Sequence, residues 1–172
     1  DKKAEGIKVT DKQCEDFKTA VFKPLETYQV AQNEITGGTV SPSYISPIQG
    51  LQRLQRIMDE YVGGVSSQFK TSKAQLDRGL ELLTVLKEDA EKLAAEDLHE
   101  LMRVWENVHR TWQAEAHLRT VLFRDETRWP GYYFRSDCPT MKEDWLAFAN
   151  CIWHPESGEW EMIKRPVKYI SV

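Results

Sequence analysis

Between residues 76 and 93 the chain carries apolar side chains at steps of three and four, and this repeat constrains its fold more than any other feature. The apolar positions are Leu76, Leu80, Leu83, Leu86, Ala90 and Leu93. The charged residues of the segment lie largely outside this stripe, and Ser72 with Gln75 ahead of it has the arrangement of a capping box. The segment is therefore predicted to be an amphipathic helix whose stripe is hidden against other apolar surface.

Two further segments show the same spacing. The first begins at a Ser-Pro pair at residues 46–47, which suits a helix start, and should weaken at two glycines at 63–64. Its apolar positions are Leu51, Leu54, Met58, Tyr61 and Val65. The second begins at Asp97, three residues before Glu100, after a predicted break near residues 94–96. Its apolar positions are Leu98, Leu101, Trp105, Val108, Trp112, Leu118, Val121 and Leu122.

An earlier helix is predicted from about residue 11. Thr10 with Gln13 has the capping-box arrangement, and Pro24 should kink or split the helix. Apolar residues follow at helical spacing, at Phe17, Ala20, Val21 and Leu25. Residues 1–10 are interpreted as a linker and residues 36–47 as a loop. Because the N-terminus has neither an initiator methionine nor an apolar leader, we expect the chain to be an internal piece of a larger protein.

The last fifty residues lose the helical period and become rich in aromatic residues. Residues 145–153 and 160–170 are predicted strands of a β-hairpin joined by a turn at 154–158, and Pro166 should lie at an edge or end the second strand. The predicted fold is mainly α within a single domain at 11–172. It has an antiparallel helical bundle of three to four main helices at 11–126, an irregular segment at 127–144 and the hairpin at 145–172.

Composition excludes several classes of function. Lys and Arg total 23 against 27 Asp and Glu, so there is no overall positive charge to attract nucleic acid, and we expect no such partner. No apolar run approaches the roughly 18 residues of a membrane span. The three cysteines form no CxxC pair, which favours a reducing cytoplasm over a disulfide framework.

Motifs for nucleotide, metal or nucleophilic chemistry are missing or badly spaced. Neither GxGxxG nor GxxxxGK occurs, so we expect no dinucleotide to bind this chain by itself. Residues 96–99 and 106–109 both read ExxH, but di-iron sites need this motif on two facing helices, and here both lie within one predicted helical region. We therefore expect no metal and no catalytic residue here, and a di-iron oxidase is the weakest alternative.

The segment RDETRWPGYYFRSDCPTMKED, residues 124–144, interleaves arginines, carboxylates and aromatic rings without a regular period. Arginine and carboxylate side chains pair with matched planar geometry, so the segment should fold with fixed turns. Two interpretations stay open, a loop that covers the end of the bundle and a surface that docks a partner. The candidate residues are Arg124, Glu126, Arg128, Trp129, Tyr132, Tyr133, Arg135, Asp137 and Trp145.

The same segment carries a family resemblance. Its spaced residues are Arg124-x-Glu126-Thr127-Arg128, then Gly131, then Arg135-x-Asp137-x-Pro139, with Asp144-Trp145 downstream. This pattern resembles the signature RxESRG…HxRxDxP…D…W of succinate dehydrogenase and fumarate reductase flavoprotein subunits. The departures are Thr127 in place of Ser, two inserted residues at 129–130, and Tyr133 in place of His. These departures are similar to the sequence of the α subunits of dissimilatory adenylylsulfate reductases. The similarity extends over residues 11–170 and includes the terminal hairpin and the segments MDEYVGG and LELLTVLKEDAEKLAAEDLHEL.

The resemblance implies a parent enzyme that uses FAD to reduce adenylylsulfate to AMP and sulfite, or runs the reverse reaction, with electrons from an iron-sulfur β subunit. In that family the FAD fingerprint and the catalytic residues lie upstream, and none of them matches this chain. The implied role is structural, docking against the FAD-binding domain and the iron-sulfur subunit. A stand-alone helical-bundle interaction module is the alternative.

Overall fold

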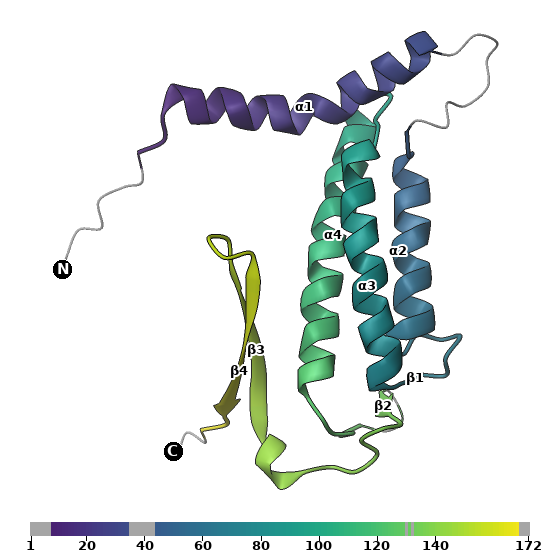
Figure 1. Ribbon diagram of the computed structural model, residues 1–172, viewed down its shortest axis with the longest axis vertical. Helices are drawn as coiled ribbons and strands as arrows, with labels where there is room; N and C mark the ends of the chain where they lie inside the picture. The colour runs from purple at the N-terminus through teal and green to yellow at the C-terminus, as the bar shows by residue number, and fades with distance from the viewer. Residues whose placement is uncertain (1–7, 35–43, 130, 132, 169–172) are drawn as a thin grey trace.

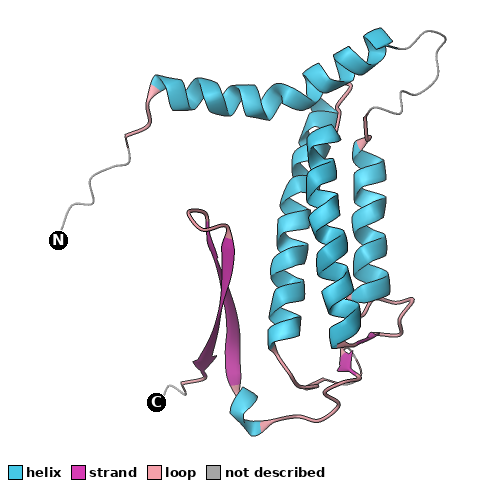
Figure 2. Cartoon of the chain, in the orientation of Figure 1, coloured by secondary structure: helices cyan, strands magenta, loops and turns pink. Residues whose placement is uncertain are grey.

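The computed structural model describes residues 8–34, 44–129, 131 and 133–168, and shows a mainly helical chain with a C-terminal strand pair (Figures 1 and 2). The α-helices are α1 (Asp11–Glu34), α2 (Pro47–Tyr61), α3 (Lys73–Asp89) and α4 (Leu98–Phe123). Two single 3₁₀ turns are η1 (Ala90–Lys92) and η2 (Glu143–Trp145). The strands are β1 (Lys70–Thr71), β2 (Phe134–Arg135), β3 (Ala147–His154) and β4 (Glu159–Pro166).

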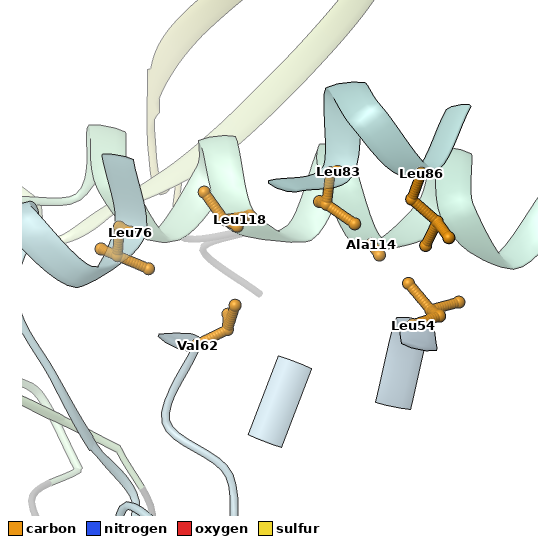
Figure 3. Close-up of a cluster of buried hydrophobic side chains, with 7 residues drawn as sticks. All are labelled: Leu54, Val62, Leu76, Leu83, Leu86, Ala114 and Leu118. Atoms are coloured by element: carbon orange, nitrogen blue, oxygen red, sulfur yellow. The ribbon is translucent and has the colours of Figure 1, made fainter. Parts of the chain in front are cut away.

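Helices α2, α3 and α4 lie side by side and form the bundle, with α3 antiparallel to the other two (Figure 1). Their core, shown in Figure 3, consists of Leu54, Val62, Leu76, Leu83, Leu86, Ala114 and Leu118. Leu76 and Leu118 are completely buried. The apolar stripe that the sequence predicts for α3 therefore lies where expected, and the antiparallel bundle is confirmed.

The predicted helix starts are also confirmed. The backbone N–H of Gln49 donates to the Ser46 hydroxyl, and the Ser46 N–H donates back to the Gln49 side chain at 3.0 Å. Asp97 accepts the N–H of Glu100 at 2.8 Å after the break that separates α3 from α4. Helix α2 ends at Tyr61, before the two glycines, so the predicted core position at Val65 is wrong, and this side chain is 75% exposed.

Helix α1 crosses the end of the bundle instead of lying alongside it (Figure 1). It begins with the predicted exchange of hydrogen bonds between Thr10 and Gln13. It continues through Pro24 without splitting, and its axis bends along its length (Figure 1). Contacts at its middle hold it in place, since the Trp105 indole N–H donates to the Val21 carbonyl at 3.1 Å and the Ala95 N–H donates to the Pro24 carbonyl at 3.0 Å.

A short parallel pair of strands, not predicted from the sequence, joins the far end of the bundle to the irregular segment. Strand β1 pairs with β2 in the register Lys70↔Phe134 and Thr71↔Arg135. The Thr71 side chain is fully buried, and its hydroxyl donates to the Tyr61 carbonyl at 2.7 Å. Strand β1 is thus held at the end of α2, and its pairing with β2 anchors the irregular segment there.

Strands β3 and β4 form the predicted antiparallel hairpin, with a register that runs from Ala147↔Pro166 to His154↔Glu159. Strand β4 ends at Pro166, as the sequence predicts. The rings of Trp153 and Trp160 pack on the ring of Trp112 in α4, with centroids 5.0 and 6.1 Å away. None of the helices in the described ranges combines the length and apolar character needed to cross a lipid bilayer.

Candidate functional site

Glu126 is the centre of a buried ion-pair network at the end of α4. Its carboxylate is fully buried and accepts hydrogen bonds from both Arg124 and Arg128, with Arg128 Nε 2.7 Å from one oxygen. The other oxygen accepts the backbone N–H of Lys142 at 2.9 Å. Burial raises the pKa of Glu126, but the donors from Arg128, Lys142 and Arg124 outweigh it and hold the pKa below its ordinary value. One carboxylate thus fixes three points of an irregular backbone.

Arg135 closes the C-terminal end of α4. Its guanidinium is 2% exposed and donates to the carbonyls of Val121 at 2.7 Å and Arg124 at 3.2 Å. The last carbonyls of a helix have no partner within the helix and carry partial negative charge, so a buried arginine satisfies both needs. The Asp137 carboxylate accepts two hydrogen bonds from the same guanidinium, from Nε at 2.9 Å and from Nη2 at 2.7 Å. These hydrogen bonds lower the pKa of Asp137 to about 2.

Arg124 and Trp145 connect the segment to the base of the hairpin. Arg124 donates to the Trp145 carbonyl at 3.3 Å and also to the Ala147 carbonyl. Its guanidinium lies 4.9 Å from the centre of the Trp145 ring, which is packed edge to face on Phe123. The Trp145 indole N–H donates to Asp125. The side chain of Trp145 is therefore buried and held on several sides.

The other aromatic candidates are placed differently. Trp129 is 71% exposed. Tyr133 is half-buried, its hydroxyl is buried without a hydrogen-bond partner among the described residues, and burial raises its pKa. Tyr132 lies outside the described residues. The charged candidates therefore pair with one another, while Trp129 projects from the network, and the docking role of the segment stays a prediction.

Sequence reasoning missed a second buried carboxylate, Glu115 on α4. It is 7% exposed and accepts from Lys87 of α3, from Arg119 at 2.8 Å and from the Trp160 indole at 3.0 Å. The Lys87 ammonium also lies 3.9 Å from the centre of the Trp112 ring. The sequence could have indicated this network, because Glu115 falls on the predicted apolar face of α4, where a buried charged residue requires partners. This network fastens the hairpin tip to the bundle.

The carboxylates of Glu126, Glu115 and Asp137 each accept at least two hydrogen bonds. Among the described residues no three His, Cys, Asp or Glu side chains are grouped closely enough to hold a metal ion. The described strands form two separate two-stranded sheets. No strand in these ranges leads into a helix through a glycine-rich turn of the kind that binds a dinucleotide pyrophosphate.

Comparison with known proteins gives consistent matches. The family model described as the fumarate reductase flavoprotein C-terminus matches residues 51–172. The adenylylsulfate reductase subunit alpha of Megalodesulfovibrio gigas is 42% identical over 154 residues, which are 89% of this chain and 23% of that protein. The chain thus spans about a quarter of the length of this relative.

Solved structures extend the comparison. Adenylylsulfate reductase from the hyperthermophilic Archaeoglobus fulgidus matches with a TM-score of 0.90 and 49% identity, over 97% of this chain and 26% of that chain. The Sdh1 complex of Mycobacterium smegmatis matches with a TM-score of 0.65 and 19% identity, over 97% of this chain and 26% of that chain, which shows a shared fold alone.

Proposed function

Since the chain belongs to the fumarate reductase flavoprotein C-terminal family, we propose that it is the C-terminal helical domain of an adenylylsulfate reductase α subunit. The observation that carries this proposal is the match to the Archaeoglobus fulgidus enzyme, with a TM-score of 0.90 over 97% of the chain. The parent subunit would carry FAD in its preceding part and interconvert adenylylsulfate with AMP and sulfite in the cytoplasm. An iron-sulfur β subunit would exchange electrons with that FAD.

Within this parent the domain supplies structure and docking surface. The networks around Glu126 and Arg135 give the end of the bundle a fixed shape without regular secondary structure. A fixed shape lowers the ordering cost of association, because fewer side chains lose freedom when a partner binds. Trp129 projects from this fixed base, and exposed aromatic anchors of this kind carry much of the energy of protein interfaces.

The activity is tested by comparing the isolated chain with the full-length subunit. The full subunit, reconstituted with an iron-sulfur subunit, should show flavin absorbance and convert adenylylsulfate to AMP and sulfite. The chain alone should show neither. Stoichiometric FAD in the chain alone, or turnover of adenylylsulfate by it, would contradict the proposal, as would a flavin-loaded parent complex with no activity on adenylylsulfate.

The docking role is tested with Trp129→Ala in the full-length subunit. Because Trp129 is 71% exposed and outside the ion-pair networks, the change should leave folding intact and weaken the association of the domains or subunits by about 10-fold or more. Met141→Ala is the matched control, since Met141 is 64% exposed in the same segment. Arg128→Ala should loosen association more than it alters substrate binding. Association with the iron-sulfur subunit is measured by pull-down. If neither Trp129→Ala nor Arg128→Ala weakened this association, and the flavin domain stayed docked in both variants, the docking role would be disproved.

A further inference from the structure

The first half of α1 is a regular helix that the rest of the described chain leaves uncovered. Every residue from 8 to 20 is exposed. Residues 11–20 extend about 15 Å at 1.5 Å per residue. Figure 1 shows this purple half projecting beyond the bundle, whereas the second half crosses the ends of the bundle helices.

The apolar residues of the projecting half continue the face through which α1 packs. Further along the helix this face contains Pro24 and Ala31, which are buried, and Leu25, which packs against the core cluster around Leu93 and Leu101. At helical spacing the same face continues toward the N-terminus, where it is made of Cys14, Phe17, Ala20 and Val21; we refer to these four residues as the α1 stripe. Phe17 is 70% exposed.

Charged side chains of the projecting half lie on the other side of the helix. The Lys18 ammonium, for example, pairs with the neighbouring Glu15 at 2.8 Å. The α1 stripe thus extends the packed apolar face of the helix toward the N-terminus, and its residues from Cys14 to Ala20 are open to water. An apolar stripe at this spacing is the recognition mode of a helix that lies in an apolar groove.

We propose that the open part of the α1 stripe docks into an apolar groove on the preceding part of the same subunit. This inference rests on the proposed function, because only a longer parent has a preceding part. The family model describes a C-terminal region, and the chain covers 26% of the Archaeoglobus fulgidus relative, so most of such a parent would precede this domain. That part would be joined to the chain just before α1.

Covalent connection favours this occupant over a separate protein. A segment joined through a short linker meets its neighbour at an effective concentration in the millimolar range. The preceding part therefore competes well against an iron-sulfur subunit or a second copy for the same stripe. The docked Phe17 ring would remove from water the largest exposed apolar side chain of the stripe.

Hydrogen exchange of residues 11–20 tests the proposal. The flavin-loaded full-length subunit, without the iron-sulfur subunit, is compared with this chain at the same low concentration. We expect exchange in the full subunit to be at least about 10-fold slower than in the chain alone. Equal exchange rates would overturn the proposal. Protection that appears only when the iron-sulfur subunit is added, or only when the concentration of the chain is raised, would assign the stripe to another occupant and overturn it too.

Two variants of the full subunit locate the contact on the helix. Phe17→Asp should restore fast exchange at residues 11–20. Phe22→Asp is the matched control, because Phe22 is also exposed, at 44%, but lies about 140° around the helix from Phe17. Equal effects of the two changes would rule out docking through the stripe. Adenylylsulfate turnover of the same unmutated subunit, measured after the iron-sulfur subunit has been added, separates the outcomes. A subunit that is protected but inactive in this assay fails the proposed function and retains the docking surface.

Discussion

The irregular segment at residues 124–144 and the first half of α1 reverse the usual relation between regularity and burial. The segment has little regular secondary structure, yet Glu126 and Arg135 within it are among the most buried side chains of the described chain. The first half of α1 has perfect helical spacing, yet every residue from 8 to 20 is exposed. A regular backbone satisfies its own hydrogen bonds, so it can project into water, whereas an irregular one needs side-chain partners and is fixed by them.

The largest expected effect tests whether the segment depends on its central carboxylate. Glu126→Ala leaves the guanidinium groups of Arg124 and Arg128 partly buried without the carboxylate that balances their charge, although both still donate to backbone carbonyls. We expect a loss of about 3–5 kcal/mol in the free energy of unfolding, the usual cost of removing one partner from a buried ion pair. Urea unfolding of the chain, followed by circular dichroism, measures this change.

An exposed ion pair on the same molecule provides the control. Glu81 pairs with Arg78 at 2.7 Å on the surface of α3, with both side chains more than half exposed, so Glu81→Ala should change stability little. If Glu126→Ala were no more costly than Glu81→Ala, the burial of the segment would have to come from its aromatic residues, and the contrast with α1 would lose its electrostatic basis.

A smaller effect is expected from pH through Asp137. Hydrogen bonds from Arg135 lower the pKa of Asp137 to about 2, compared with 3.8 for the ordinary side chain. Because the pKa of Asp137 is lower in the folded state than in the unfolded state, its ionised carboxylate stabilises the folded protein. This contribution is fully present above about pH 4 and is lost as the pH falls toward 2. With solvent screening of this partly exposed carboxylate, the contribution is about 1 kcal/mol.

Asp137→Asn separates this contribution from those of other carboxylates. The difference in unfolding free energy between the natural chain and the variant should be largest near pH 6 and shrink as pH falls from 4 to 2. A difference that stayed constant over this range would mean that Asp137 is not ionised in its pairing with Arg135, and that the arginine is held by the α4 carbonyls alone.

Sequence patterns predicted the parts of the fold that local chemistry determines. The bundle followed from stripes such as Leu76 and Leu83, and helix starts followed from Ser46 and Asp97, because spacing and capping act within a few residues. The pairing of β1 with β2 gave no such signal. It joins two residues on each side that are separated in the chain by α3 and α4, and the preceding Gln68 has a left-handed φ of 54° that its residue type does not favour.

The candidate site was predictable in kind but not in detail. The alternation of arginines and carboxylates indicated pairing, and Arg135 does pair with Asp137. Its second role, closing α4 through the Val121 carbonyl, depends on where the helix ends in space. The position of α1 is likewise fixed in part by the hydrogen bonds from the Trp105 indole to the Val21 carbonyl and from the Ala95 N–H to the Pro24 carbonyl, which no periodicity encodes.

The smallest expected effect concerns the open half of α1. In this chain alone, Phe17→Ser should change the free energy of unfolding by less than about 0.5 kcal/mol, because a side chain that is 70% exposed loses little contact when it is shortened. Leu25 lies on the same face of α1, in its packed half, and contacts the core cluster around Leu93 and Leu101. Leu25→Ser should therefore lower the free energy of unfolding clearly more than Phe17→Ser. Urea unfolding of both variants compares the two halves of one helix directly. If Phe17→Ser were as costly as Leu25→Ser, the ring would already be packed within the chain, and α1 would no longer contrast with the segment at 124–144.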